Sequence, residues 1–437
     1  MKLSKFNIFI PIDENGNQMI FNTFTDSRVI VNKELIEVIE KTSNGVNVKG
    51  LNREEEGYLN QLKELGIIVE DEVDEYMEME YIFQKSKFDT SVLNITILPT
   101  YACNLKCIYC FQDGVKSRKS MSHDTCRHTA YWIIKRMDNI RPKTLRLVFY
   151  GGEPLLNTRA IRFLSEVLSN AAHQRSILQE INIITNGVLL KKEVVDSLLP
   201  FGLKGIKVTL DGDADAHDSR RYYKDGTGTF HKILNNILAI RGKVGLRIGG
   251  NFDNSNKGSI PRLLDILKEN GLERDLASVD FKPVLKNMDG AKRGDPFCET
   301  CTFSDIDVKD FIWLKREIKE RGFMTMEGVA LGPCEVSKEY NYTIDPSGKI
   351  YKCGGFVGME EFVIGDIYSD GFNYKHTLFM TADLWKKCRD CPYIFLCGGG
   401  CRSTALVKEG DFREVTCEKD YFENVTKEIL KDSAINN

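Results

Sequence analysis

Three cysteines within one short stretch give the first chemical signal of this sequence. Cys103, Cys107 and Cys110 have the spacing C-x3-C-x2-C, and an aromatic residue, Tyr109, precedes the last of them. Three thiolates on one loop can bind three irons of a cubane [4Fe–4S] cluster and leave the fourth iron free for a ligand that is not protein. Zinc is the alternative, but zinc sites usually have four ligands, and no fourth Cys or His lies nearby.

A second, larger group of cysteines lies near the end of the sequence. Three consecutive glycines, 398–400, would let the chain wrap tightly between two of these cysteines. Seven thiolates can almost fill two four-iron clusters, although the Cys388-x2-Cys391 pair taken alone would suit zinc equally well. The seven residues are Cys334, Cys353, Cys388, Cys391, Cys397, Cys401 and Cys417.

The bulk properties restrict the class of protein. A length of 437 residues predicts two or three domains. The net charge is −3, so no basic field indicates a nucleic-acid partner. No apolar run is long enough for a membrane span and no signal peptide is evident, so we expect no membrane association and a cytoplasmic location. Disulfides are disfavoured there, and the 13 cysteines therefore indicate metal binding, except for Cys126, expected to be a buried apolar residue.

From Val92 onward, strand-like and helical segments alternate along the chain. Repeated βα units predict a parallel sheet with right-handed crossovers, and six units favour an α/β fold with a partial (βα)6 TIM-like barrel over a closed eight-stranded one. The predicted strands span 93–98, 145–150, 181–184, 205–210, 246–250 and 279–283.

Residues able to bind a ligand follow the ends of these strands, where parallel α/β folds place their chemistry. The cysteine loop follows the first strand, and the Gly151-Gly152-Glu153 triplet follows the second, where the glycines can expose backbone groups. We interpret the His217-Asp218-x-x-Arg221 motif as a loop ion pair. Further candidates near the ends of the third, fourth and fifth strands are Thr185, Asn186, Asp211, Arg247 and Asn251.

The cysteine loop resembles the cluster loop of the radical S-adenosylmethionine (SAM) enzymes. In that family the open iron takes the amino and carboxylate groups of SAM, and an electron from the cluster then generates a 5′-deoxyadenosyl radical. The family's Gly-Gly-Glu element contacts the methionine amine, and residues after the third strand lie near the ribose. The resemblance places Arg247 and Asn251 near the SAM carboxylate or adenosine. The implied cofactor-binding residues are Gly151, Gly152, Glu153, Thr185, Asn186, Asp211, Arg247 and Asn251.

The seven late cysteines resemble those of the SPASM extension of radical SAM enzymes at every position. The resemblance implies two auxiliary clusters, and hence three [4Fe–4S] clusters in all. Either Cys298 or Cys301 completes the second auxiliary cluster, or that cluster keeps an open iron. The implied ligands are Cys388, Cys391, Cys397 and Cys417 for one auxiliary cluster, and Cys334, Cys353 and Cys401 for the other.

The region before the first predicted strand has the pattern of a small, separate domain. A hairpin, a short helix, a second helix that opens with an Asn52 capping box, and a final short strand predict a winged-helix-like α+β fold. This order resembles the leader-recognition domains of peptide-modifying radical SAM enzymes, which add a leader peptide as an extra strand. The predicted division is a recognition domain at 1–75, an acidic linker at 76–91, the barrel at 92–290, and a bridging region with the SPASM domain at 291–437.

The combined resemblance implies a maturase of a ribosomally made precursor peptide, reduced by flavodoxin or ferredoxin, that forms a thioether or carbon–carbon crosslink. The first alternative is an anaerobic sulfatase maturase, which oxidises a Cys or Ser to formylglycine. That family has an Asp directly after the cysteine that matches Cys353, whereas this chain has Gly354. The second alternative is an iron–sulfur electron carrier, which would need neither an open-iron loop nor a barrel. No catalytic base is assigned.

Overall fold

The structure of the chain is a computed structural model. Its described residues are 1–43, 52–110, 112–284, 308–325 and 332–435. None of the described helices is long and apolar enough to cross a lipid bilayer. The chain divides into two compact units, each built from distant segments. The first unit comprises Met1–Lys87, Gly328–Cys334 and Asp383–Asn437, and the second comprises Phe88–Glu327 and Glu335–Ala382.

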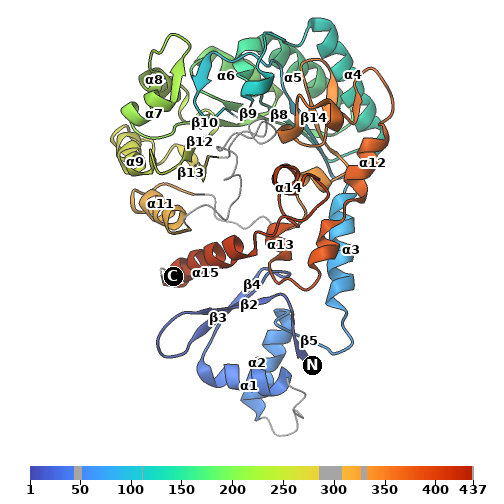
Figure 1. Ribbon diagram of the computed structural model, residues 1–437, viewed down its shortest axis with the longest axis vertical. Coiled ribbons are helices and arrows are strands. Elements are labelled where there is room, and N and C mark those ends of the chain that lie inside the picture. The colour runs from blue at the N-terminus through green and yellow to red at the C-terminus, as the bar shows by residue number, and fades with distance from the viewer. Residues whose placement is uncertain (44–51, 111, 285–307, 326–331, 436–437) are drawn as a thin grey trace. The chain divides into compact units, whose positions relative to one another are not determined.

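A nine-stranded sheet forms the centre of the second unit (Figure 1). Six of its strands are parallel neighbours in chain order, and they correspond to the six predicted strands. The parallel α/β fold is therefore confirmed. The six strands are β6 (Val92–Ile97), β8 (Thr144–Phe149), β9 (Leu178–Thr185), β10 (Leu203–Thr209), β12 (Gly245–Phe252) and β13 (Leu276–Pro283). The sheet continues past β6 through β14 (Asn341–Ile344), β15 (Lys349–Tyr351) and β16 (Gly365–Asp366).

Helices cover the outer face of this curved sheet (Figure 1). Their apolar residues recur at helical spacing, as in α5, where Ile161, Leu164 and Leu168 are all buried. The inner face is more polar. In β10, for example, Ile206 and Val208 face the helices, and the residues that alternate with them face the other way. The helices between the strands are α4 (His123–Ile140), α5 (Thr158–His173), α6 (Lys192–Leu198), α7 (Ala214–Arg220), α8 (Phe230–Ile240) and α9 (Ile260–Glu269), and α11 (Val308–Glu320) and α12 (Tyr374–Thr381) follow β13 and β16.

The start of the first unit has the predicted hairpin, two helices and final strand. Asn52 forms the predicted capping box with Glu55 at the start of α2. The structure adds a third strand, β4, which pairs with β3 and forms one edge of a three-stranded sheet. The elements are β1 (Lys2–Leu3), β2 (Asn7–Pro11), β3 (Gln18–Asn22), β4 (Ser27–Val31), α1 (Lys33–Ser43), α2 (Arg53–Glu64) and β5 (Ile68–Val69), with β5 paired to β1.

The expected acidic linker at 76–91 is instead largely helical. Helix α3 (Glu75–Lys87) buries Met79 and Phe83 completely, four residues apart on one face. Phe83 packs edge-to-face on Trp385, with ring centroids 5.2 Å apart. Two of the acidic residues that suggested a solvated linker have protein partners. Glu75 is buried and bonded to Ser4, and Glu80 accepts a hydrogen bond of 2.6 Å from the Trp385 indole.

The N-terminal sheet and the cysteine-rich C-terminal segment share a hydrophobic core. Ile8 and Ile10 of β2 pack with Tyr393 and Leu396 in one buried cluster. Thr23 Oγ1 also donates a 2.6 Å hydrogen bond to the carbonyl of Pro392. The predicted boundaries at 75 and 291 assign these two segments to separate domains, whereas the structure joins them through one hydrophobic core. The C-terminal segment contributes α13 (Ile394–Cys397), α14 (Arg402–Glu409) and α15 (Lys419–Ile435).

A buried ion pair of 2.7 Å between Lys87 and Asp383 connects α3 to the C-terminal segment of this unit. We expect Lys87→Met to lower the free energy of unfolding by about 2 kcal/mol at pH 7, because it leaves a desolvated carboxylate. Burial alone would raise the pKa of Asp383, but hydrogen bonds from Lys87 and Lys386 hold it below its usual value. The stabilisation is thus present at neutral pH and is lost as the pH falls below about 4.

Denaturant unfolding of the wild type and the variant at pH 7 and pH 3 measures this effect. The stability difference should shrink at the lower pH. The matched control is Lys63→Met, which removes an exposed pair with Glu70 and should change stability by less than about 0.5 kcal/mol. An equal loss in the two variants would contradict the assignment.

Candidate functional site

The cysteine loop follows β6 at the carboxyl end of the sheet, as predicted. Its middle part forms β7 (Leu105–Cys107), which pairs antiparallel with β11 (Arg221–Tyr223) so that Cys107 lies opposite Arg221. Tyr101 anchors the loop by donating a 2.8 Å hydrogen bond to Asp345. The three cysteines are therefore held by a strand pair and a buried tyrosine.

The two glycines of the Gly151-Gly152-Glu153 triplet allow a close approach between two loops. A side chain at Gly152 would lie 2.3 Å from the carbonyl oxygen of Ala102, and Gly151 has a φ of +129°, which favours glycine. The Glu153 N–H donates a 2.8 Å hydrogen bond to the same Ala102 carbonyl. The triplet thus fixes the position of the cysteine loop through its backbone.

The Glu153 carboxylate is fully buried and binds three protein donors. These are the Leu155 N–H at 3.0 Å, Thr185 Oγ1 at 2.7 Å and the Asn186 N–H at 2.8 Å. Burial raises the pKa of Glu153, and the three donors oppose that shift. Asn186 in turn donates to Asn104 at 2.9 Å, within the cysteine loop. The structure therefore brings these predicted residues together, with the Glu153 and Thr185 side chains bonded to the protein itself.

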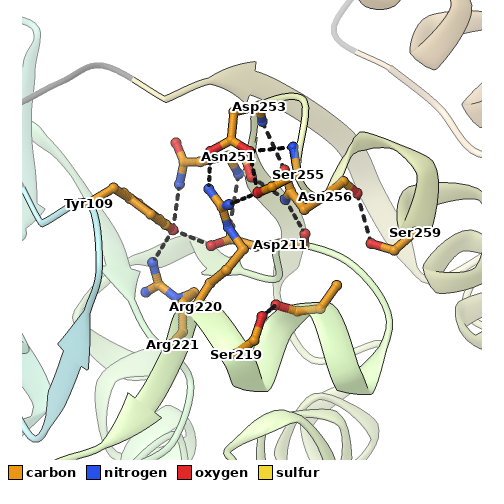
Figure 2. Close-up of polar contacts among 11 residues, drawn as sticks. Tyr109, Asp211, Ser219, Arg220, Arg221, Asn251, Asp253, Ser255, Asn256 and Ser259 are labelled. Carbon is orange, nitrogen blue, oxygen red and sulfur yellow. Dashed lines mark hydrogen bonds and ion pairs between the residues drawn. The ribbon is translucent and has the colours of Figure 1, made fainter. Parts of the chain in front are cut away.

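A second network surrounds Tyr109 (Figure 2). The Tyr109 hydroxyl is hydrogen-bonded to Asp211, receives a 2.7 Å bond from Arg221 and receives a 3.2 Å bond from Asn251. Asp211 is fully buried and also accepts from the Asn251 N–H at 2.8 Å. Asp211 and Asn251, both predicted site residues, thus meet at the aromatic residue of the cysteine loop.

Arg221 is a buried cation directly beside the cysteine loop. Its side chain is 9% exposed overall, and its Nε has no hydrogen-bond partner in the described part of the chain. The predicted loop ion pair is wrong, because Asp218 accepts instead from the N–H groups of Thr229 and Phe230 at the start of α8. The sequence motif singled out Arg221. Only the pairing of β11 with β7, which the sequence did not predict, places its positive charge beside the cysteine loop.

Arg247 does not lie where the sequence placed it. Strand β12 runs from Gly245 to Phe252, so Arg247 lies near its beginning, paired with Lys207. Four residues of extended strand, about 13 Å, separate it from Asn251. Arg247 is therefore removed from the proposed SAM contacts.

Burial disfavours ionisation of two thiols of the loop, Cys103 and Cys107. Burial raises the pKa of Cys103 to about 11 and also raises the pKa of Cys107. The Leu105 N–H points at the Cys103 sulfur at 3.5 Å, a contact that favours a thiolate. Iron binding here would release protons and would weaken as the pH falls. Among the described residues, no three His, Cys, Asp or Glu side chains lie close enough together to bind one metal ion.

Burial and neighbouring thiols disfavour ionisation of three late cysteines of the first unit, Cys388, Cys391 and Cys397. Burial and the neighbouring Cys391 and Cys417 raise the pKa of Cys388. Burial raises the pKa of Cys397 to about 11, against the opposing effect of the Gly399 and Gly400 N–H groups. Neighbouring thiols of this kind suit an iron cluster, which would neutralise several thiolates at once.

Arg402 holds the glycine loop between two of these cysteines. Its guanidinium is 3% exposed and donates to the carbonyl oxygens of Gly399 and, at 2.7 Å, Gly400. The three glycines 398–400 all have positive φ, as the predicted tight wrap requires. Cys353 belongs to the second unit and accepts from the Gly355 N–H at 3.4 Å. Cys298 and Cys301 lie outside the described residues, and the ligand assignments of all the cysteines stay predictions.

Comparison with known proteins agrees with this geometry. Residues 97–254, which include the cysteine loop and the Tyr109 network partners Asp211, Arg221 and Asn251, match the Radical SAM superfamily. The chain is 27% identical over 373 residues to a cysteine-type anaerobic sulfatase-maturating enzyme of Clostridium novyi (strain NT), covering 77% of this chain and 96% of that protein. It is 24% identical over 330 residues to the PqqA peptide cyclase of Granulibacter bethesdensis, covering 71% and 83%.

Among solved structures, Streptococcus suis SuiB bound to precursor peptide SuiA has the same fold. The TM-score is 0.53 at 16% identity, and the alignment covers 96% of this chain and 99% of SuiB. Residues 97–254 therefore form a radical SAM domain. This class uses SAM and a [4Fe–4S] cluster, for which the loop of Cys103, Cys107 and Cys110 has the required three thiols.

Proposed function

We propose that this enzyme modifies a ribosomally synthesised precursor peptide and forms a thioether or carbon–carbon crosslink. The observation that carries the proposal is the convergence, at the carboxyl end of one parallel sheet, of the three-cysteine loop, a buried Arg221 and the Tyr109 network. A cluster with bound SAM supplies a 5′-deoxyadenosyl radical, which abstracts a hydrogen atom from a substrate.

The described residues suit that cofactor in distinct ways. Cys103, Cys107 and Cys110 would hold the cluster. The unpartnered Nε of Arg221 is a buried cationic donor suited to the SAM carboxylate. Asp211 and Asn251 fix the Tyr109 hydroxyl within the cysteine loop.

Crosslink formation removes two hydrogen atoms from the peptide. One leaves by abstraction, and the other leaves as a proton while its electron passes to an acceptor. Cys388, Cys391, Cys397 and Cys417 would hold that acceptor as an auxiliary [4Fe–4S] cluster of a SPASM domain, and Arg402 would fix the loop around it. Reduced flavodoxin or ferredoxin would deliver the electron that starts the reaction.

The N-terminal α+β fold supports peptide recognition. Strand β4 is an edge of its sheet, and an edge strand offers unpaired backbone groups to an added strand. The likeness to SuiB covers 96% of this chain, and that structure is titled as bound to its precursor peptide. A leader peptide bound at β4 would raise the effective concentration of the peptide segment to be modified.

Formylglycine formation is the second candidate, because a sulfatase-maturating enzyme is among the relatives. Gly354 and Gly355 follow Cys353, where the proposed base of that family would stand. Incubation of the reconstituted enzyme with a short precursor peptide encoded beside its gene separates the two reactions. A crosslink removes two hydrogen atoms from the peptide mass, whereas formylglycine gives an aldehyde that reacts with a hydrazide. An aldehyde product would overturn the crosslinking proposal.

The proposed leader site is tested at Ile30, which is 54% exposed on β4. We expect Ile30→Lys to raise the KM for a leader-bearing peptide about tenfold and to leave kcat unchanged, because it places a charge on the docking strand. The matched control is Leu178→Lys in β9, where the side chain is 60% exposed. Equal KM values for Ile30→Lys and the wild type would contradict recognition at β4. Deletion of the N-terminal domain is unsuitable, because it would expose Tyr393 and Leu396.

A further inference from the structure

The inner face of the parallel sheet gathers positive charge on three neighbouring strands. Lys207 of β10 is paired with Arg247 of β12, and Lys282 of β13 is paired with Asn251 of β12. Paired residues of parallel strands project from the same face of a sheet, so all of these side chains share the face away from the helices. The first pair lies toward the start of the strands and the second toward their carboxyl ends.

The absence of a side chain at Gly249 leaves room for the Lys207 side chain on this face. A side-chain carbon at Gly249 would lie 2.1 Å from Lys207 Cε and 2.8 Å from Lys207 Nζ. Gly249 is two residues beyond Arg247, the pairing partner of Lys207. The Lys207 side chain therefore leans toward the carboxyl end of the sheet, where Asn251 contacts Tyr109.

Among the described residues, one acidic side chain, Asp280, lies near these three cations. Asp280, opposite Gly249, is the acidic side chain closest in register, and it accepts a 3.2 Å hydrogen bond from Thr325, which is also bonded to Lys315. No ion pair of Lys207, Arg247 or Lys282 is present among the described residues. Burial lowers the pKa of Lys207, and Lys282 and Arg247 lower it further, whereas Asp280 opposes the shift. Three cations thus face one acidic group that already has partners.

We propose that Lys207, with Arg247 before it and Lys282 beyond it along the sheet, forms a binding site for a carboxylate of the substrate. Lys207 is the central contact, and the site holds the acidic group on the inner face of the sheet, below the residues that surround Tyr109. The inference deepens the proposed function, because it assigns an acidic residue or a carboxyl terminus to the peptide segment being modified. It depends on the proposed function only for the identity of the substrate as a peptide.

The experiment measures binding of three short peptides to the reconstituted enzyme with saturating SAM, by calorimetry. Acetyl-Gly-Glu-Gly-amide carries a side-chain carboxylate, acetyl-Gly-Gln-Gly with a free terminus carries a main-chain carboxylate, and acetyl-Gly-Gln-Gly-amide carries neither. We expect one or both acidic peptides to bind at least about tenfold more tightly than the neutral one. The tighter of the two acidic peptides identifies the source of the carboxylate. Equal binding of all three, or no binding of any, would overturn the proposal.

Two variants and a control locate the site. Lys207→Met should weaken binding of the acidic peptide about tenfold. Lys204→Met, which changes an exposed lysine of the same strand, should leave that binding unchanged. Gly249→Ala keeps every charge but displaces the Lys207 side chain, so it should also weaken binding of the acidic peptide. This variant provides the test if Lys207→Met does not fold. SAM affinity should be unchanged in all of these. A matching loss of SAM affinity would assign the cations to the cofactor and overturn the inference, while leaving the peptide-modifying function intact.

Discussion

Cys107→Ala is expected to abolish formation of 5′-deoxyadenosine from SAM. Cys107 is the middle thiol of the loop and lies in β7, opposite Arg221. Two thiols cannot hold three irons of a cubane, so the site that binds SAM would be lost. The measurement is chromatographic detection of 5′-deoxyadenosine after anaerobic reconstitution and reduction, together with iron and sulfide per chain.

The iron content of the same variant tests the auxiliary clusters. Loss of the loop cluster should remove about four irons per chain, leaving about eight if two auxiliary clusters are present and about four if there is one. The control is Cys126→Ala, a buried thiol of α4 at 2% exposure, which should keep its iron and its SAM cleavage. Retained SAM cleavage in Cys107→Ala would show that the loop does not hold the reactive cluster, and bound zinc in the wild type would do the same.

The elements that could be predicted from sequence are those that local patterns determine. Each of the six parallel strands is a short segment with recurring buried apolar residues between helical segments, and all six lie within a few residues of their predicted ends. The Asn52 capping box was predictable because it involves residues three positions apart. The place of the cysteine loop directly after β6 was predictable because it follows from the local order of strand and loop.

The elements that could not be predicted depend on partners far along the chain. The buried face of α3 is explained by Trp385, about 300 residues later, so the local excess of acidic residues indicated a linker. Arg247 shows the same difficulty within one strand. The resemblance placed it near SAM, but Arg247 lies near the start of β12, which extends to Phe252. Arg221 gained its place in the site only through the pairing of β11 with β7.

Arg221→Met is expected to weaken SAM binding by at least about a hundredfold, the equivalent of about 2.7 kcal/mol. The guanidinium is a buried cation with an Nε that has no partner among the described residues. A charged donor in a desolvated position binds a carboxylate strongly, and removal of one partner of such a pair costs several kcal/mol. Equilibrium binding of SAM to the reconstituted, unreduced enzyme measures the change without any catalytic step.

Arg247→Met supplies the matched control, because the resemblance placed Arg247 near SAM, whereas the structure places Arg221 beside the cysteine loop. We expect Arg247→Met to bind SAM as the wild type does. Arg221→Lys should recover part of the affinity, since it keeps the charge but loses the forked donor geometry. The iron content of all three variants should match the wild type, which separates loss of SAM binding from loss of the cluster. If Arg247→Met weakened SAM binding and Arg221→Met did not, the carboxylate would have to bind about 13 Å further down the sheet, away from the cysteine loop.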